Sequence, residues 1–285
     1  MADEKEIKQI KIGNDTYDIA VNSLDRVAGL RDALTISGTV TKEIGGIAKN
    51  TTYDNASLET VLSDLLFPYV KPDITGLAIY NESSSSVSGT HEYGTSITVD
   101  KFKPTFTKGS KPITSIKVGT TSGGNDLYSS TSASSGTTYT LTNSKTYNGK
   151  TIGTNYIYCT IGDGEQTDST YASIIFSYYP YAYTSSSTSV SSITSGAQKS
   201  ESTYASSSFE LTLSSESYVW ILLPPGTSGT KKIQYEALGQ WYDFDGGTTG
   251  PTDVSLKLNS GETVTYKGYR TNKKAAAGTT SFKIV

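Results

Sequence analysis

Apolar residues recur at every second position in short runs over residues 71–285, and clusters of Gly, Ser, Asn and Asp separate the runs. The runs NYIYCTI at 155–161 and FELTL at 209–213 show the pattern. Successive side chains of a strand point to opposite faces, so this alternation collects the apolar ones on one face. Antiparallel sheets that pack one face on a core have this pattern. The sequence therefore predicts a mainly β chain.

The spacing of the runs predicts two antiparallel Ig-like β-sandwich domains, over residues 71–183 and 184–285. About seven short strands with turn signals every ~8–12 residues fill the first region, which is the pattern of an immunoglobulin-like sandwich. The Cys…Trp…Cys spacing of antibody domains is absent from the sequence, so the prediction concerns architecture alone. The stretch YYPYAY and the Ser/Thr tract after it mark the boundary. The predicted strands are 74–80, 97–106, 113–118, 139–141, 155–161 and 173–179, then 209–213, 218–223, 232–238, 241–244, 254–258, 264–269 and 281–285.

Residues 57–67 are the strongest helical signal in the chain. Five apolar residues fall at i, i+3, i+4, i+7 and i+8, one stripe on a 3.6-residue period: Leu58, Val61, Leu62, Leu65 and Leu66. Ser57 is placed to cap the first turn, and Pro68 ends the helix because it has no N–H to donate. A helix of about 10 residues is marginal by itself, so we expect its apolar stripe to pack on a neighbour.

Residues 1–70 are predicted to form an anchor built from this helix and a β-hairpin. Apolar residues alternate over 10–12 and 17–21, on both sides of a Gly-Asn-Asp turn. A two-stranded hairpin is not stable alone in water, so it must pack on another chain. A short helix over 25–34 is a further expectation. The residues expected to make the docking and oligomerisation contacts are Ile10, Ile12, Tyr17, Ile19, Leu58, Val61, Leu62, Leu65 and Leu66.

Composition argues against several kinds of partner. Charged residues make up 18% of the chain and the net charge is −3, which is too little and of the wrong sign for a nucleic-acid-binding surface. The single cysteine cannot form an intrachain disulfide. The N-terminal MADEKEIKQIKI has no signal-peptide core, and no apolar run approaches the ~18 residues of a membrane span. We therefore expect a protein made in a cytoplasm, with neither a nucleic-acid nor a membrane partner.

No catalytic constellation is recognisable, and we expect neither enzyme activity nor a cofactor. His91 is the only histidine and follows a Ser/Gly loop, which favours a surface position over a metal or catalytic role. Cys159 alternates with isoleucines inside a predicted strand, which favours a buried structural thiol. Asp243 and Asp245 look like a fragment of a calcium loop, but the other ligands are missing and a tight turn is favoured. A pair of carboxylates for glycoside hydrolysis stays an open alternative, because the two groups must be close in space but can lie far apart in the sequence.

Tyrosine is the surface residue type that bears most on function, and the chain contains 21 tyrosines. A tyrosine ring offers flat contact area with a polar tip at low entropic cost, which suits protein and sugar surfaces alike. Cross-strand pairs on half-buried sheets account for most of these tyrosines in our interpretation. Trp241 and Tyr242 are the candidate ligand contacts.

Several segments, taken in order, resemble structural proteins of tailed bacteriophages, including those of gut Bacteroidales. The stretch IKIGNDTYDI at 10–19 is similar to a hairpin that opens many tail and fibre proteins. The pair GGI and LSDLLFPYVKP within 45–72 is similar to an element that recurs in these structural proteins. The likeness continues through FSYYPYAY at 176–183, YVWILLPPG at 218–226, LGQWYDF at 238–244 and VTYKGYRTN at 264–272.

The resemblance implies a non-enzymatic virion protein: a fibre, a tail or neck appendage, or a capsid decoration. Its N-terminal segment would dock to other virion proteins and its β-domains would project outward. It also implies a homo-oligomer, with a trimer favoured as in many fibres. The alternative is a carbohydrate-binding adhesin whose exposed Tyr and Trp side chains stack on host-surface glycans. A glycan depolymerase is a third reading, disfavoured by one His, one Cys and no metal-ligand cluster in the sequence.

Overall fold

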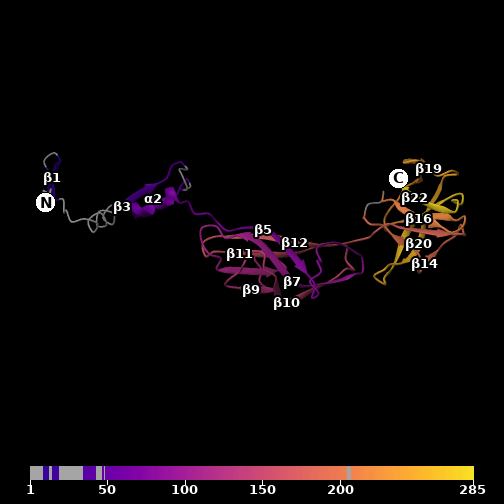
Figure 1. Ribbon diagram of the computed structural model, residues 1–285, viewed down its shortest axis with the longest axis horizontal. Coiled ribbons are helices and arrows are strands. Elements are labelled where there is room, and N and C mark those ends of the chain that lie inside the picture. Colours follow the sequence, from indigo (N-terminus) through magenta and orange to yellow (C-terminus); the bar gives the residue numbers. More distant parts are fainter. Residues whose placement is uncertain (1–8, 13–14, 19–34, 43–46, 48, 204–206) are drawn as a thin grey trace, which may run out of the picture. The chain divides into compact units, whose positions relative to one another are not determined.

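The computed structural model describes residues 9–12, 15–18, 35–42, 47, 49–203 and 207–285 (Figure 1). Within these residues the chain is mainly β, as predicted, with one short helix. The chain divides into an N-terminal unit, residues 1–72 with 108–112, and a larger compact unit, residues 73–107 with 113–285.

Two antiparallel strand pairs, β1 with β2 and β3 with β4, form the sheets of the N-terminal unit. The bounds are Gln9–Ile12 for β1, Asp15–Asp18 for β2, Thr35–Thr39 for β3 and Thr52–Ser57 for β4. The β1–β2 pair confirms the predicted hairpin over its described part, with Ile10 opposite Tyr17. Ile19 and the short helix predicted over 25–34 lie outside the described residues.

The predicted helix is confirmed as α2 (Leu58–Leu66), which follows β4 without a break. The Ser57 hydroxyl accepts a hydrogen bond from the Thr60 N–H at 3.1 Å, so the predicted cap is in place. The helix lies against the β3–β4 pair. There the Tyr53 hydroxyl donates to the Asp64 carboxylate at 2.9 Å, which joins β4 to α2.

The first β-sandwich of the larger unit faces a three-stranded sheet, β10-β7-β5, with a five-stranded sheet, β6-β12-β11-β8-β9. Neighbouring strands are antiparallel except β6, which runs parallel to β12. The order β5-β7-β10 opposite β12-β11-β8-β9 is that of the A-B-E and G-F-C-C′ strands of an immunoglobulin-type sandwich. The bounds are β5 (Asp73–Tyr80), β6 (Gly89–Glu92), β7 (Ser96–Thr107), β8 (Ser115–Gly119), β9 (Tyr128–Ser130), β10 (Tyr139–Asn148), β11 (Gly153–Gly162) and β12 (Thr167–Ser177).

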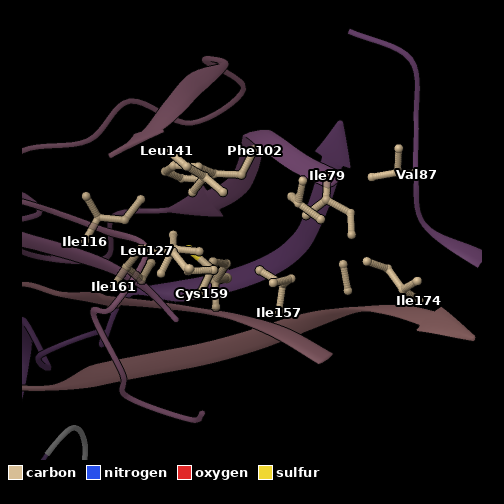
Figure 2. Packing of buried hydrophobic residues seen from close by; sticks show 14 of the residues in the cluster. Ile79, Val87, Phe102, Ile116, Leu127, Leu141, Ile157, Cys159, Ile161 and Ile174 are labelled. Carbon is tan, nitrogen blue, oxygen red and sulfur yellow. The ribbon is translucent and has the colours of Figure 1, made fainter. Parts of the chain in front are cut away.

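Side chains from both sheets meet in the core of the first sandwich (Figure 2). Ile79 of β5 and Phe102 of β7 belong to the same buried cluster as Ile157 of β11 and Ile174 of β12. Cys159 lies among them and is fully buried. Because side chains alternate along a strand, the residues between these positions on β11 and β12 face away from the core.

The second sandwich faces a six-stranded sheet, β14-β20-β21-β17-β13-β15, with a four-stranded sheet, β16-β22-β18-β19. Val219 and Ile221 of β17 share a core with Phe209 of β16 and Phe282 of β22. The strand order differs from that of the first sandwich. The bounds are β13 (Tyr181–Ser185), β14 (Ser192–Ile193), β15 (Gln198–Lys199), β16 (Phe209–Leu213), β17 (Tyr218–Leu223), β18 (Ile233–Ala237), β19 (Gln240–Asp243), β20 (Thr248–Lys257), β21 (Thr263–Thr271) and β22 (Gly278–Ile284).

The six-stranded sheet is buried on its outer face as well. Trp220 and Leu222 alternate with the core residues of β17 and are buried on the opposite side. Ile193 of β14 is part of the same cluster, and Val190 and Ala197 pack against it. The Ser/Thr-rich connection that follows β13 therefore covers this sheet and belongs to the second sandwich.

The chain passes from one sandwich to the other over the three residues between β12 and β13. The boundary predicted between residues 183 and 184 falls inside β13, all of which pairs with β17, so the second sandwich begins at Tyr181. The carboxylate of Glu92, a buried residue of β6, accepts a hydrogen bond from the Tyr181 hydroxyl. The Tyr179 hydroxyl donates to the Thr90 carbonyl oxygen at 3.1 Å. We call this set of contacts the joint.

Aromatic rings and an ion pair complete the joint. The ring centres of Tyr93 and Tyr178 are 4.8 Å apart. The Lys150 ammonium lies 2.7 Å from the Glu262 carboxylate. Gly94 has a φ of +83°, and a Cβ there would lie 2.5 Å from Cγ of Glu262, so this close approach requires glycine. The two sandwiches are thus held together by side chains from both.

The buried hydrogen bond of the joint gives a stability prediction. Tyr181→Phe leaves the buried Glu92 carboxylate without its tyrosine donor, and we expect the free energy of unfolding to fall by about 1–3 kcal/mol. Tyr183→Phe is the matched control, because Tyr183 lies on the same strand and its hydroxyl has no hydrogen-bond partner among the described residues. Urea denaturation of both variants measures the difference. Equal losses in the two variants would contradict the importance of the Tyr181–Glu92 contact.

Candidate interaction surfaces

The apolar stripe of α2 is the first candidate surface. None of the helix residues is buried, although Leu58, Val61 and Leu65 are partly covered. Leu62 is 42% exposed and Leu66 is 64% exposed. Contiguous exposed apolar surface of this kind marks an interaction site in many proteins. The stripe predicted from the sequence is therefore present on the described helix and is incompletely covered.

The stripe continues past the end of the helix. Phe67 is 77% exposed, and it lines a shallow groove together with Leu58, Leu62 and Leu66. Val70 beyond it is also exposed. The backbone of Val70 is held by Ser110, whose N–H donates to the Val70 carbonyl oxygen at 2.9 Å. The apolar surface thus extends over the helix and the segment after it.

The β1–β2 hairpin is the second predicted docking element. The structure places Ile10 opposite Tyr17 and Ile12 opposite Asp15. Ile19 lies outside the described residues. The docking role of Ile10, Ile12, Tyr17 and Ile19 stays a prediction.

Trp241 and Tyr242, the predicted ligand contacts, lie on β19 in the hairpin that it forms with β18. Tyr242 is exposed, and its ring centre is 5.9 Å from that of Tyr235. Trp241 is half-buried, with the Lys283 ammonium 4.3 Å from its ring centre. One face of the indole therefore carries a cation–π contact within the chain, which leaves less of the ring for a ligand.

Three tyrosines on the first sandwich form an exposed cluster that the sequence analysis did not single out. Tyr156 and Tyr158 lie on β11, and Tyr171 of β12 is the register partner of Tyr158. The ring centres of Tyr156 and Tyr171 are 5.0 Å apart, and each is 5.9 Å from that of Tyr158. We call this cluster the tyrosine face. The alternation of Tyr156 and Tyr158 with two buried residues is a signal that could have found it.

Other tyrosines are structural. Tyr181, Tyr266 and Tyr269 are among the largest fully buried side chains of the described chain. The ring of Tyr181 meets that of Tyr266 edge to face at a centre distance of 5.8 Å. Burial, and after it the Glu92 carboxylate, raises the pKa of Tyr181. These tyrosines therefore act as core side chains, in line with the prediction that much of the tyrosine excess packs.

The residues considered for chemistry have structural partners. A ring nitrogen of His91, Nε2, lies 2.9 Å from the Val87 carbonyl oxygen. Asp243 pairs with Lys232 at 2.6 Å, and Asp245 pairs with Lys273 at 2.7 Å, so both carboxylates of the candidate calcium loop are engaged by lysines. Hydrogen bonds from Gln234 and then from Lys232 lower the pKa of Asp243, and the hydrogen bond from Lys273 lowers the pKa of Asp245. The described residues contain no cluster of three or more His, Cys, Asp or Glu suited to a metal ion.

Comparison with known proteins gives no match from which a function could be transferred. No protein-family model matches the chain, and no curated protein matches it. Among the helices described, none has the length and apolar character needed to cross a membrane.

The buried thiol gives a prediction about reactivity. Burial raises the pKa of Cys159 to about 12, so the thiol stays protonated at about pH 8, and the thiolate is the reactive form. We expect a thiol-specific chromogenic reagent to leave Cys159 unmodified in the native chain and to modify it fully in denaturant. The denatured chain is the control for reagent quality. Stoichiometric labelling of the native chain would show that Cys159 is accessible and activated.

Proposed function

We propose that this chain is a non-enzymatic structural protein of a bacteriophage virion, such as a fibre, a tail or neck appendage, or a capsid decoration. The N-terminal unit attaches the chain to other virion proteins, and the two sandwiches are displayed. The observation that carries the proposal is the exposed apolar stripe of α2 in a unit separate from the two sandwiches. The ordered likeness of the sequence to phage structural proteins supports it.

The attachment role follows from the small size of the elements involved. The described part of the N-terminal unit offers two strand pairs and a helix of nine residues. Two-stranded hairpins and helices of this length are marginal alone, so they gain stability by burying their apolar surface on a partner. Leu62, Leu66 and Phe67 supply that surface. Copies of the same chain and other virion proteins are the partners, with a trimer favoured.

The display role follows from the larger unit. Each sandwich has a core of its own, and the joint connects them through buried and half-buried side chains. Neither core includes residues of α2. The sandwiches can therefore keep their fold while the helix is engaged by a partner.

The attachment role predicts the effect of charges on the apolar stripe. The double variant Leu62→Asp, Leu66→Asp removes two exposed leucines that a partner would bury, and we expect self-association to weaken by about tenfold or more for each leucine. The solution mass of the purified chain should fall from that of a trimer to that of a monomer. Incorporation into virus particles should fall with it.

Thr60→Glu is the matched control for added charge on α2. The side chain lies in the first turn, where the helix dipole favours a carboxylate, and the stripe is left intact. It should keep the wild-type mass. A monomeric wild-type chain whose residues 1–70 resist protease would count against attachment. Unfolding of the first sandwich in the Leu62, Leu66 double variant would show that the helix is core.

A carbohydrate-binding adhesin is the second candidate function, and the exposed aromatic rings favour it. Tyr156 and Tyr171 are exposed on the first sandwich, and Tyr242 is exposed on the second. Aromatic rings with a polar tip at a wet surface suit sugar ligands as well as proteins. A displayed β-domain that binds host-surface glycans is compatible with the virion role.

Carbohydrate binding predicts a positive result on a glycan array. The labelled wild-type chain should bind a restricted set of surface glycans, and the soluble form of the same glycan should compete for the binding. The chain unfolded by heat serves as the control for adhesion to the array itself. If no glycan retains the chain, the structural role remains without the adhesin role.

A further inference from the structure

The three rings of the tyrosine face contact one another and are supported by the strand beneath them. Tyr156 is 39% exposed and Tyr171 is 57% exposed, while Tyr158 between them is half-buried. The Tyr156 and Tyr171 rings meet edge to face at an interplanar angle of 84°. The hydroxyl of Tyr147 donates to the Tyr156 carbonyl oxygen at 3.3 Å, which ties this part of β11 to β10. The rings are therefore supported by one another and by the strand below them.

The strands beneath the tyrosine face form a regular ladder. β11 and β12 pair over ten consecutive residues without a bulge, from Gly153 opposite Phe176 to Gly162 opposite Thr167. On the other side of the same strands, Ile157, Cys159 and Ile174 are fully buried (Figure 2). Because a packed core holds these strands, their backbone would lose little conformational freedom when a ligand binds on the outward side.

The side chains around the rings are mostly hydroxyls. Ser173 is the register partner of Tyr156, and Thr160 is the partner of Ser169, with their hydroxyl oxygens 2.7 Å apart. Lys117 of β8 is the partner of Thr160 and is exposed. The outward positions of β8, β11 and β12 carry no carboxylate: Ser115, Lys117, Thr154, Tyr156, Tyr158, Thr160, Thr167, Ser169, Tyr171, Ser173, Ile175 and Ser177.

This composition favours a sugar chain over a protein partner. A stable protein interface buries about 1,200–2,000 Å² and has an apolar core with a polar rim. The tyrosine face has three rings and one partly covered aliphatic residue, Ile175, among hydroxyls, so it has little apolar surface to bury. Sugar rings present a C–H face that stacks on an aromatic ring and hydroxyls that exchange hydrogen bonds with Ser, Thr and Tyr. Lys117 is the single charged side chain at these positions, so ring stacking and hydrogen bonds, and not charge, would select the ligand, which favours a neutral sugar chain.

We propose that the tyrosine face binds a neutral glycan chain, with sugar rings stacked on Tyr156 and Tyr171 and the neighbouring hydroxyls as hydrogen-bond partners. The inference rests on the second candidate function, carbohydrate binding, and gives that function a site different from Trp241 and Tyr242. The ligand lies across β11 and β12 along the surface. Three rings and the neighbouring hydroxyls offer several contacts side by side, so we take the ligand to be an extended sugar chain and not a single sugar.

The test uses the full chain on an array of neutral gluco-, manno- and galacto-oligosaccharides beside their uronic-acid counterparts. We expect the wild-type chain to retain a neutral glycan. Tyr156→Ala and Tyr171→Ala should each weaken that binding about tenfold or more, because each removes a stacking ring. Tyr156→Phe and Tyr171→Phe keep the rings and should stay within about threefold of the wild type. Leu238→Asn is the control for an exposed apolar side chain elsewhere, since Leu238 is 100% exposed on the second sandwich.

The outcomes separate the site from the function. Loss of glycan binding in Trp241→Ala, with Tyr156→Ala and Tyr171→Ala unchanged, would keep carbohydrate binding and overturn the tyrosine face as its site. A wild-type chain that retains no glycan would overturn both. A drop in solution mass on Tyr171→Ala would assign the face to self-association and overturn the proposal. Thermal unfolding of each variant checks that its fold is retained. If an Ala variant is destabilised, Tyr156→Leu and Tyr171→Leu, which keep apolar volume without an aromatic ring, take its place and should lose binding in the same way.

Discussion

Burial of tyrosine is the constraint on which this structure depends. The chain is rich in tyrosine, and its cores take up Tyr181, Tyr266 and Tyr269 beside the aliphatic residues. A buried ring contributes large apolar area, but its hydroxyl must find a partner, since an unpaired buried polar group destabilises the fold. The Tyr269 hydroxyl donates to the Gly229 carbonyl oxygen at 2.9 Å, and the Tyr181 hydroxyl donates to Glu92. The Tyr266 hydroxyl is buried without a hydrogen-bond partner among the described residues. The packing of Tyr181 and Tyr269 thus brings specific polar contacts between segments far apart in the sequence.

The joint is the place where this constraint shapes the molecule most. Tyr179 and Tyr181 lie in and just after the connection between the sandwiches, and their hydroxyls reach back to Thr90 and Glu92 of the first. An aliphatic residue at either position could fill the same space without selecting a partner. The tyrosines do select one, because each hydroxyl needs an acceptor at a defined place. A three-residue connection with two such tethers restricts how the sandwiches can be joined.

Sequence patterns predicted the helix and strands whose formation depends on local periodicity. The alternation in Phe209–Leu213 and the stripe with its Ser57 cap predicted β16 and α2, because side-chain direction and capping involve residues close in the sequence. β6 and the two-residue strands β14 and β15 were not predicted, since each is a strand only through a partner far along the chain. The same holds for the surfaces. Trp241 is partly covered by Lys283 from another strand, which no local pattern shows.

The tyrosine face and the joint are connected by a single strand. β12 carries Tyr171 in its middle, and its last residue, Ser177, leads directly into the tyrosines of the joint. Near that end Phe176 pairs with His91 of β6, and the Ser177 carbonyl oxygen accepts from the Tyr93 N–H at 2.9 Å. A ligand on the tyrosine face, as proposed, would therefore be linked to the second sandwich through paired backbone and buried hydroxyls. A displayed contact surface gains from this property, because a packed connection leaves less conformational freedom to be lost on binding than a loose linker would.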